Sequence, residues 1–152
     1  MTKAKTSRPQ PRTATVRRLH EAPAPRKGCV LFVDDEEALV QIGQEMLDYL
    51  GYEAVVRTRS PEALAVFRAA PEQFDLVVTD YEMPHMSGKV LARKLRDIRP
   101  DIPIILCTGS RVMTGVNAHR PGFDALLRKP FRLDDVALAI DLALTPRAPQ
   151  KS

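Results

Sequence analysis

Short apolar runs alternate along most of the chain with segments in which apolar residues recur at helical spacing. The runs are typical of buried strands and lie at residues 29–33, 53–57, 75–79, 102–107 and 125–127. Apolar positions three and four residues apart predict helices near residues 39–50, 90–98 and 136–144, with a weaker one at 111–121, and a further helix is expected to begin at Ser60. Five strands alternating with five helices predict an α/β fold, in which a doubly wound parallel sheet is covered on both faces.

Local signals mark where some of these helices begin and end. Gly51 follows the first helical segment, and Pro100 follows the third. The second helix is predicted to begin at Ser60, with the serine as the N-terminal cap and Pro61 in the first helical position.

The charge of the chain divides into two unequal parts. The net charge is +4, but residues 1–27 hold eight Lys or Arg against one acid, so the remaining residues carry 15 basic and 18 acidic side chains. Residues 1–27 are also rich in proline and poor in large apolar side chains, which predicts a disordered basic tail. We expect a folded domain over residues 28–145 and a flexible C-terminal tail at 146–152. The basic tail is interpreted as solvated, with an arm for nucleic acid, anionic lipid or an acidic partner as the alternative.

Composition excludes several classes of protein. No run of about 18 apolar residues is present, so a membrane span is not expected. Cys29 and Cys107 are too few for a disulfide framework or a cysteine metal site, and both lie in apolar runs. They are expected to be buried, reduced thiols in the cytoplasm.

Polar residues suited to one kind of chemistry follow four of the predicted strands. Asp34 and Asp35 follow the first, Asp80 the third, Thr108 the fourth and Lys129 the fifth. Carboxyl ends of parallel strands share one edge of a sheet, where such folds bind ligands. Clustered carboxylates repel one another and need a cation, and Mg²⁺ suits oxygen ligands. The set predicts metal-assisted phosphoryl transfer onto a carboxylate.

At these positions the chain resembles a known family. The segments VDDE, VVTDYEMPHMSG, ILCTGS and LLRKPF occur in order and are similar to the receiver domain of two-component response regulators, over residues 28–145. The resemblance implies a flavodoxin-like sheet with strand order 2-1-3-4-5. The run IRPDIPIILCTG further resembles receivers of hybrid histidine kinases.

The resemblance also implies a metal site and a phosphoacceptor. Asp80 would accept the phosphoryl group. Mg²⁺ would be held directly by Asp35, Asp80 and the backbone carbonyl of Glu82, with Asp34 acting more through water.

Two residues are implied to bind phosphoryl oxygens. Thr108 would hydrogen-bond one of them and Lys129 would pair with another, with a cis peptide bond before Pro130 aiming the lysine inward. Leu126 departs from the family pattern, which often has an aromatic ring there that reports the movement of the threonine. The acidic side chain of Glu82 is expected to change the lifetime of the phosphoryl group.

The resemblance implies a signalling protein and no conventional enzyme, because only self-phosphorylation and self-dephosphorylation are expected. The donor would be a histidine kinase or a histidine phosphotransfer protein. A downstream protein would dock on the surface formed by the helix at 111–121, the strand at 125–127 and the last helix. A weak homodimer is also left open. Only eight residues follow Leu144, so no output domain is expected. The protein is expected in the cytoplasm, without nucleic acid as a partner.

Three alternatives stay open at this stage. The domain would act as a phosphate sink or relay, or as a constitutive binding module that works through its basic arm. A phosphatase with an aspartate nucleophile is the third, but that family expects an Asp-x-Asp motif after the first strand, where this chain has adjacent acids.

Overall fold

The computed structural model describes residues 25–109 and 122–146. Most of the predicted N-terminal tail, the predicted helix at 111–121 and most of the predicted C-terminal tail lie outside the described residues. Within them, no helix has the length and apolar character needed to cross a membrane.

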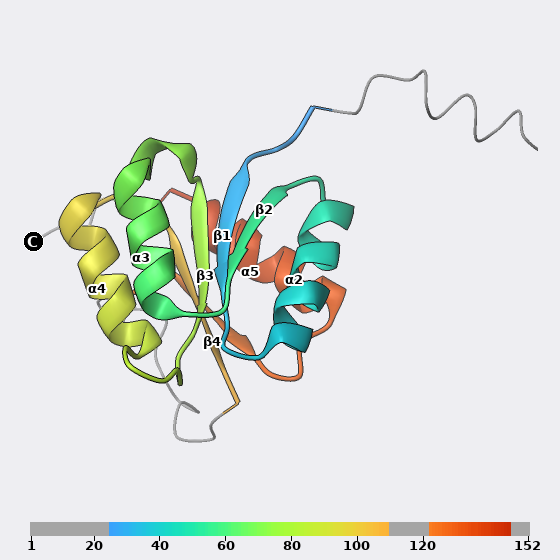
Figure 1. The fold of residues 1–152 in the computed structure, drawn as a ribbon. Coiled ribbons are helices and arrows are strands. Elements are labelled where there is room, and N and C mark those ends of the chain that lie inside the picture. The colour runs from blue at the N-terminus through green and yellow to red at the C-terminus, as the bar shows by residue number, and fades with distance from the viewer. Residues whose placement is uncertain (1–24, 110–121, 147–152) are drawn as a thin grey trace, which may run out of the picture.

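The described residues form one parallel sheet with helices on both faces (Figure 1). The strands are β1 (Cys29–Val33), β2 (Glu53–Arg57), β3 (Leu76–Asp80), β4 (Ile104–Thr108) and β5 (Ala125–Arg128). The helices are α2 (Glu37–Tyr49), α3 (Ser60–Ala69), α4 (Gly88–Ile98) and α5 (Leu133–Leu144), with a short 3₁₀ turn η1 (Pro71–Gln73). The strand order is β2-β1-β3-β4-β5, which confirms the predicted fold class.

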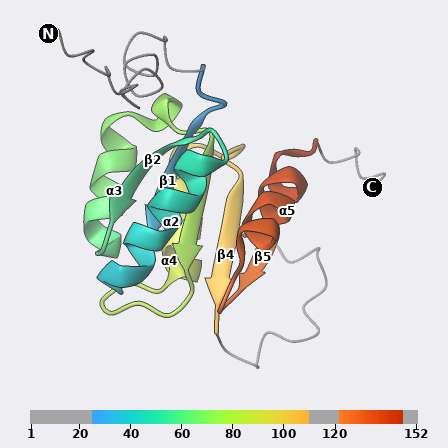
Figure 2. The same cartoon turned by 90° about the vertical axis from the view of Figure 1, so that its right-hand side faces the viewer.

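Two apolar layers hold the helices on the sheet. In Figure 1, α3 and α4 lie on one side of the strands, and α2 and α5 lie on the other, the side seen in Figure 2. Alternate strand residues face alternate layers, so Val30 and Phe32 pack with α2 and α5, whereas Leu31 and Val33 pack with α3 and α4. Because every residue of β1, β3 and β4 is buried, these strands form the centre of the domain.

The strand boundaries differ slightly from the prediction. β4 begins at Ile104 and not at residue 102, because Pro103 lacks the N–H that a central strand must donate. The carbonyl of Pro103 still accepts a hydrogen bond from the Val77 N–H, at 3.0 Å. β3 begins at Leu76, one residue later than the predicted run, and Asp80 is its last residue.

The predicted capping role of Ser60 is wrong. α3 does begin at this point, but the N-cap position is Arg59, and no side chain caps the helix. The Ser60 hydroxyl instead donates a hydrogen bond of 2.7 Å to the backbone carbonyl of Met86, 26 residues along the chain. Pro61 lies in the first turn, as predicted. Both cysteines are free and buried.

Candidate functional site

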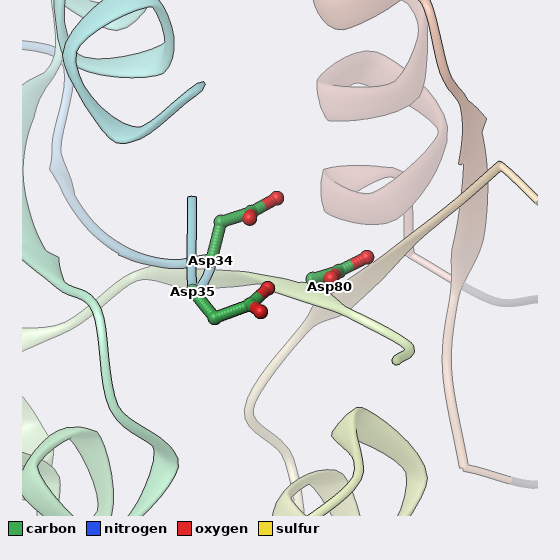
Figure 3. A group of neighbouring side chains, drawn as sticks. All are labelled: Asp34, Asp35 and Asp80. Atoms are coloured by element: carbon green, nitrogen blue, oxygen red, sulfur yellow. The ribbon is translucent and has the colours of Figure 1, made fainter. Parts of the chain in front are cut away.

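Three carboxylates gather at the carboxyl end of the sheet (Figure 3). Asp34 and Asp35 follow β1, and Asp80 ends the neighbouring strand β3, whose Thr79 pairs with Val33. One carboxylate oxygen from each of the three residues lies within 4.8 Å of the others. Asp34 and Asp80 are buried, whereas Asp35 is exposed. The predicted acidic cluster is therefore formed by the strand register, and one of its members is accessible from solvent.

Lys129 supplies the positive charge of this cluster. Its ammonium nitrogen lies 2.8 Å from Oδ2 of Asp34 and 3.1 Å from Oδ1 of Asp80. The lysine follows β5, and its backbone N–H donates to the carbonyl of Thr108 at 2.9 Å. The peptide bond between Lys129 and Pro130 is cis, as the resemblance implied.

Burial and charge change the proton affinities of these groups. Burial and the charge of Asp34 raise the pKa of Asp80, Lys129 lowers it, and the net result is a pKa of about 6. Burial by itself would lower the pKa of Lys129, but hydrogen bonds to Asp34 and Asp80 raise it above its ordinary value. One ammonium therefore compensates only part of the charge of three carboxylates.

The two oxygens of Asp34 are already engaged. Oδ1 accepts the N–H of Glu36 at 2.9 Å, and Oδ2 faces Lys129. This arrangement fits the expectation that Asp34 acts on a metal through water, with Asp35 and Asp80 as direct ligands. The remaining oxygen donors and the uncompensated charge suit a hard divalent cation such as Mg²⁺.

Two further predicted residues lie at the same edge of the sheet. Thr108 ends β4, is buried, and accepts the Lys129 N–H through its backbone carbonyl. Glu82 lies two residues beyond Asp80 with an exposed side chain, and it forms no ion pair with any other described residue.

The helix that follows Asp80 starts in direct contact with it. The N–H of Gly88 donates to the carbonyl of Tyr81 at 2.8 Å. A Cβ atom at Gly88 would lie 2.0 Å from the backbone oxygen of Asp80, so only glycine fits this close approach. The loop over residues 81–87 is thus tied at both ends to the backbone of the candidate phosphoacceptor.

Comparison with known proteins identifies the family. Residues 30–141 match the family model described as "Response regulator receiver domain". This chain belongs to that family. The receiver assignment agrees with the adjacent acids after β1 and disfavours the alternative of an aspartate phosphatase.

Curated response regulators are similar over the receiver domain. The response regulator SaeR of Staphylococcus epidermidis is 32% identical over 110 residues, covering 72% of this chain and 47% of SaeR. The DNA-binding transcriptional regulator NtrC of Azospirillum brasilense is 32% identical over 121 residues, covering 79% of this chain and 25% of NtrC. The receiver chain thus spans half or less of these relatives.

Solved receiver structures share the fold. A receiver domain protein from Clostridium thermocellum is 30% identical, with a TM-score of 0.71, and the match covers 77% of this chain and 94% of that one. The receiver domain of the hybrid histidine kinase CckA is 25% identical, with a TM-score of 0.65, covering 78% of this chain and all of that one.

The sequence predicted most of the residues that meet in the receiver's site, but not the hydrogen bond between Ser60 and the loop after Asp80. Asp34, Asp35, Asp80 and Lys129 were predicted from strand ends and do meet. The bond between Ser60 and the loop after Asp80 was not predicted, because nothing in the sequence near Ser60 points to a partner so far along the chain.

Proposed function

We propose that this receiver accepts a phosphoryl group on Asp80 from a phosphohistidine donor, with Mg²⁺ bound beside it. The observation that carries the proposal is the position of Lys129, whose ammonium lies against Asp34 and Asp80 at the mouth of a three-carboxylate cluster. A nucleophile, oxygen ligands for a cation and a donor for phosphoryl oxygens therefore lie within one site.

In the proposed step, Asp80 displaces the donor histidine directly at phosphorus. An ionised carboxylate oxygen of Asp80 attacks phosphorus, so that a P–O bond forms while the P–N bond to the donor histidine breaks. The imidazole nitrogen leaves with the bonding electron pair and is protonated from solvent. Attack by water on the resulting acyl phosphate restores the Asp80 carboxylate and releases inorganic phosphate.

Each neighbour of Asp80 has a separate part in this step. The Lys129 ammonium, which contacts Asp80, would donate hydrogen bonds to a phosphoryl oxygen as the charge on the transferring group redistributes. Thr108 ends the adjacent strand, at the position from which its hydroxyl would bind a second phosphoryl oxygen. When bound, Mg²⁺ would lower the repulsion between phosphate and carboxylates, held by Asp35, Asp80 and the carbonyl of Glu82.

The output of the proposed function is protein docking and not turnover of a small molecule. The donor would be a histidine kinase or a histidine phosphotransfer protein in the cytoplasm. A downstream partner would contact β5 and α5 together with residues 111–121, which lie outside the described part of the chain. Because Leu126 in β5 replaces the usual aromatic ring, the signal would pass through the backbone after Thr108. A role as a phosphate relay or sink uses the same chemistry without a docked target.

The proposal is tested by labelling with acetyl phosphate in the presence of Mg²⁺, followed by intact-mass measurement. The wild-type chain should gain one phosphoryl group, and Asp80→Asn should gain none. Asp97→Asn, at an exposed position in α4, is the matched control and should be labelled like the wild type. Equal labelling of Asp80→Asn and wild type would overturn the assignment of Asp80.

A further inference from the structure

Ser60 is a buried polar residue whose contacts lead towards the site and not into its own helix. Only 1% of its surface is exposed. Its hydroxyl donates to the carbonyl of Met86 at 2.7 Å and also lies 3.6 Å from the sulfur of Met83. The hydroxyl of the first residue in α3 therefore contacts the loop between β3 and α4 at two points.

This loop contains the residue implied to offer a backbone carbonyl to the metal. It begins with Tyr81, whose N–H donates to the carbonyl of Cys107 at 2.8 Å, and it ends where Gly88 contacts Asp80 and Tyr81. Between these anchors lies Glu82, next to Met83 in the chain. Within the described residues, Ser60 is the only side chain from another element with a hydrogen bond to residues 82–87.

The backbone of the same loop is held in an uncommon conformation. His85 has a φ of 71°, a region that non-glycine residues seldom adopt. The next residue, Met86, donates its N–H to the carbonyl of Pro84 at 2.7 Å, which closes a tight turn. The carbonyl of Met86, at the end of this turn, accepts the hydroxyl of the buried Ser60, which gives both polar groups a partner.

We infer that Ser60 is a positioning residue for the metal site: it holds the loop at Met83 and Met86 so that the Glu82 carbonyl faces the carboxylate cluster. This inference rests on the proposed function, because it concerns the same Mg²⁺ site. A purely structural role is the competing explanation. The competing role would change stability without changing the affinity for the cation.

The test compares alanine variants of two serines that contact this loop region in different ways. Ser60→Ala removes the tie between α3 and the loop. Ser87→Ala is the matched control, because the Ser87 hydroxyl accepts the N–H of Val90 at 3.3 Å and caps α4 without bonding to α3. Ser60→Thr keeps the hydroxyl and serves as the conservative variant.

The measurement is the Mg²⁺ dissociation constant of the full chain, from amide and methionine-methyl NMR shifts. We expect Ser60→Ala to bind Mg²⁺ roughly 3- to 10-fold more weakly, in line with the loss of one buried hydrogen bond. The methyl signals of Met83 and Met86 should also shift in the metal-free protein. Ser87→Ala should bind Mg²⁺ like the wild type, and Ser60→Thr should recover most of the affinity.

The outcomes separate the inference from the function beneath it. If the wild type binds Mg²⁺ and Ser60→Ala, shown to be folded, binds it equally well, the inference fails and the proposed function stands. If Ser60→Ala and Ser87→Ala weaken Mg²⁺ binding equally, the inference also fails, since any disturbance near the loop would then lower the Mg²⁺ affinity. If the wild type binds no Mg²⁺, the proposed function fails and the inference fails with it.

Discussion

The ammonium of Lys129 lies 2.8 Å from the carboxylate of Asp34, although two strands, β3 and β4, separate β5 from β1 in the sheet. The lysine thus reaches across the carboxyl edge of the sheet to a residue that follows β1. Asp80, at the end of β3, lies along this path and also contacts the ammonium. One ammonium thus pairs with two of the clustered carboxylates, and a bound Mg²⁺ would partly replace it.

Lys129→Met should therefore separate metal binding from phosphoryl transfer. Removal of a competing cation from the carboxylates should raise the Mg²⁺ affinity by roughly 10-fold or more, because opposite charges in direct contact interact by several kcal/mol. The same variant should be labelled slowly by acetyl phosphate, since a donor to the phosphoryl oxygens is lost. Without Mg²⁺ its free energy of unfolding should fall by roughly 2–4 kcal/mol, because a buried pair loses one partner.

Calorimetric Mg²⁺ titration and urea unfolding check both parts of this prediction. Lys94→Met, at an exposed position in α4, is the control and should leave both quantities unchanged. An Mg²⁺ affinity for Lys129→Met at or below that of the wild type would mean that the lysine does not compete with the metal.

The raised pKa of Asp80 predicts an uncommon pH dependence for the metal-free protein. The folded pKa is about 6 against an ordinary value of 3.8, so the folded state binds more protons than the unfolded state between these values. Stability contributed by this group should fall as pH rises from about 4 to about 6, by on the order of 2–3 kcal/mol.

Asp80→Asn should remove this fall, because its side chain does not titrate. The difference in free energy of unfolding between Asp80→Asn and wild type should grow from pH 4 to pH 6 and then stay level, as measured by urea unfolding. Saturating Mg²⁺ should reduce the difference. A difference that is independent of pH would show that Asp80 is not strained by burial and by Asp34.

Asp34 and Asp35 should respond differently to substitution, although they are neighbours in the chain. Asp35 is exposed, so Asp35→Asn should weaken Mg²⁺ binding with less than about 0.5 kcal/mol of change in metal-free stability. Asp34 is buried and accepts the Glu36 N–H, so Asp34→Asn should also lower the metal-free stability, by about 1–3 kcal/mol.

The stabilisation that Mg²⁺ confers on each variant gives the measurement. A ligand that binds only the folded state adds about 2.7 kcal/mol when its concentration is 100 times the dissociation constant. Wild type should gain stability with rising Mg²⁺, and Asp35→Asn should gain little. Full Mg²⁺ stabilisation of Asp35→Asn would exclude that residue as a direct ligand.

The sequence predicted the parts of this fold that depend on apolar patterning and strand ends. The strands were recognisable because each is a short apolar run, fully buried in β1, β3 and β4, and the carboxyl edge then followed from the parallel arrangement. Local sequence signals, such as a helix-capping motif, predicted less well where the side chain bonds to a residue far along the chain. Ser60 has the sequence context of a helix cap, but the carbonyl of Met86 receives its hydroxyl, and only the packing of α3 against the loop reveals this.

Gly88 should tolerate no side chain, because a Cβ there would lie 2.0 Å from the backbone oxygen of Asp80. Gly88→Ala should lower the free energy of unfolding by roughly 1–3 kcal/mol and displace the start of α4. Gly109→Ala is the matched control, since among the described residues its Cβ would meet only the Lys129 side chain, at 3.9 Å. The free energy of unfolding of both variants is measured by thermal and urea unfolding. Equal stability of the two would contradict a close approach of Gly88 to the Asp80 carbonyl.

The most direct test of the account is an NMR titration of the full chain with beryllofluoride, a stable mimic of the phosphoryl group, in the presence of Mg²⁺. We expect amide shifts at Asp35, Asp80, Thr108 and Lys129 that extend into β5 and α5. Shifts confined to these four residues and their neighbours would favour a relay or sink that binds phosphate without transmitting a signal. No response in the presence of Mg²⁺ would contradict the proposal that Asp80 is a working phosphoacceptor.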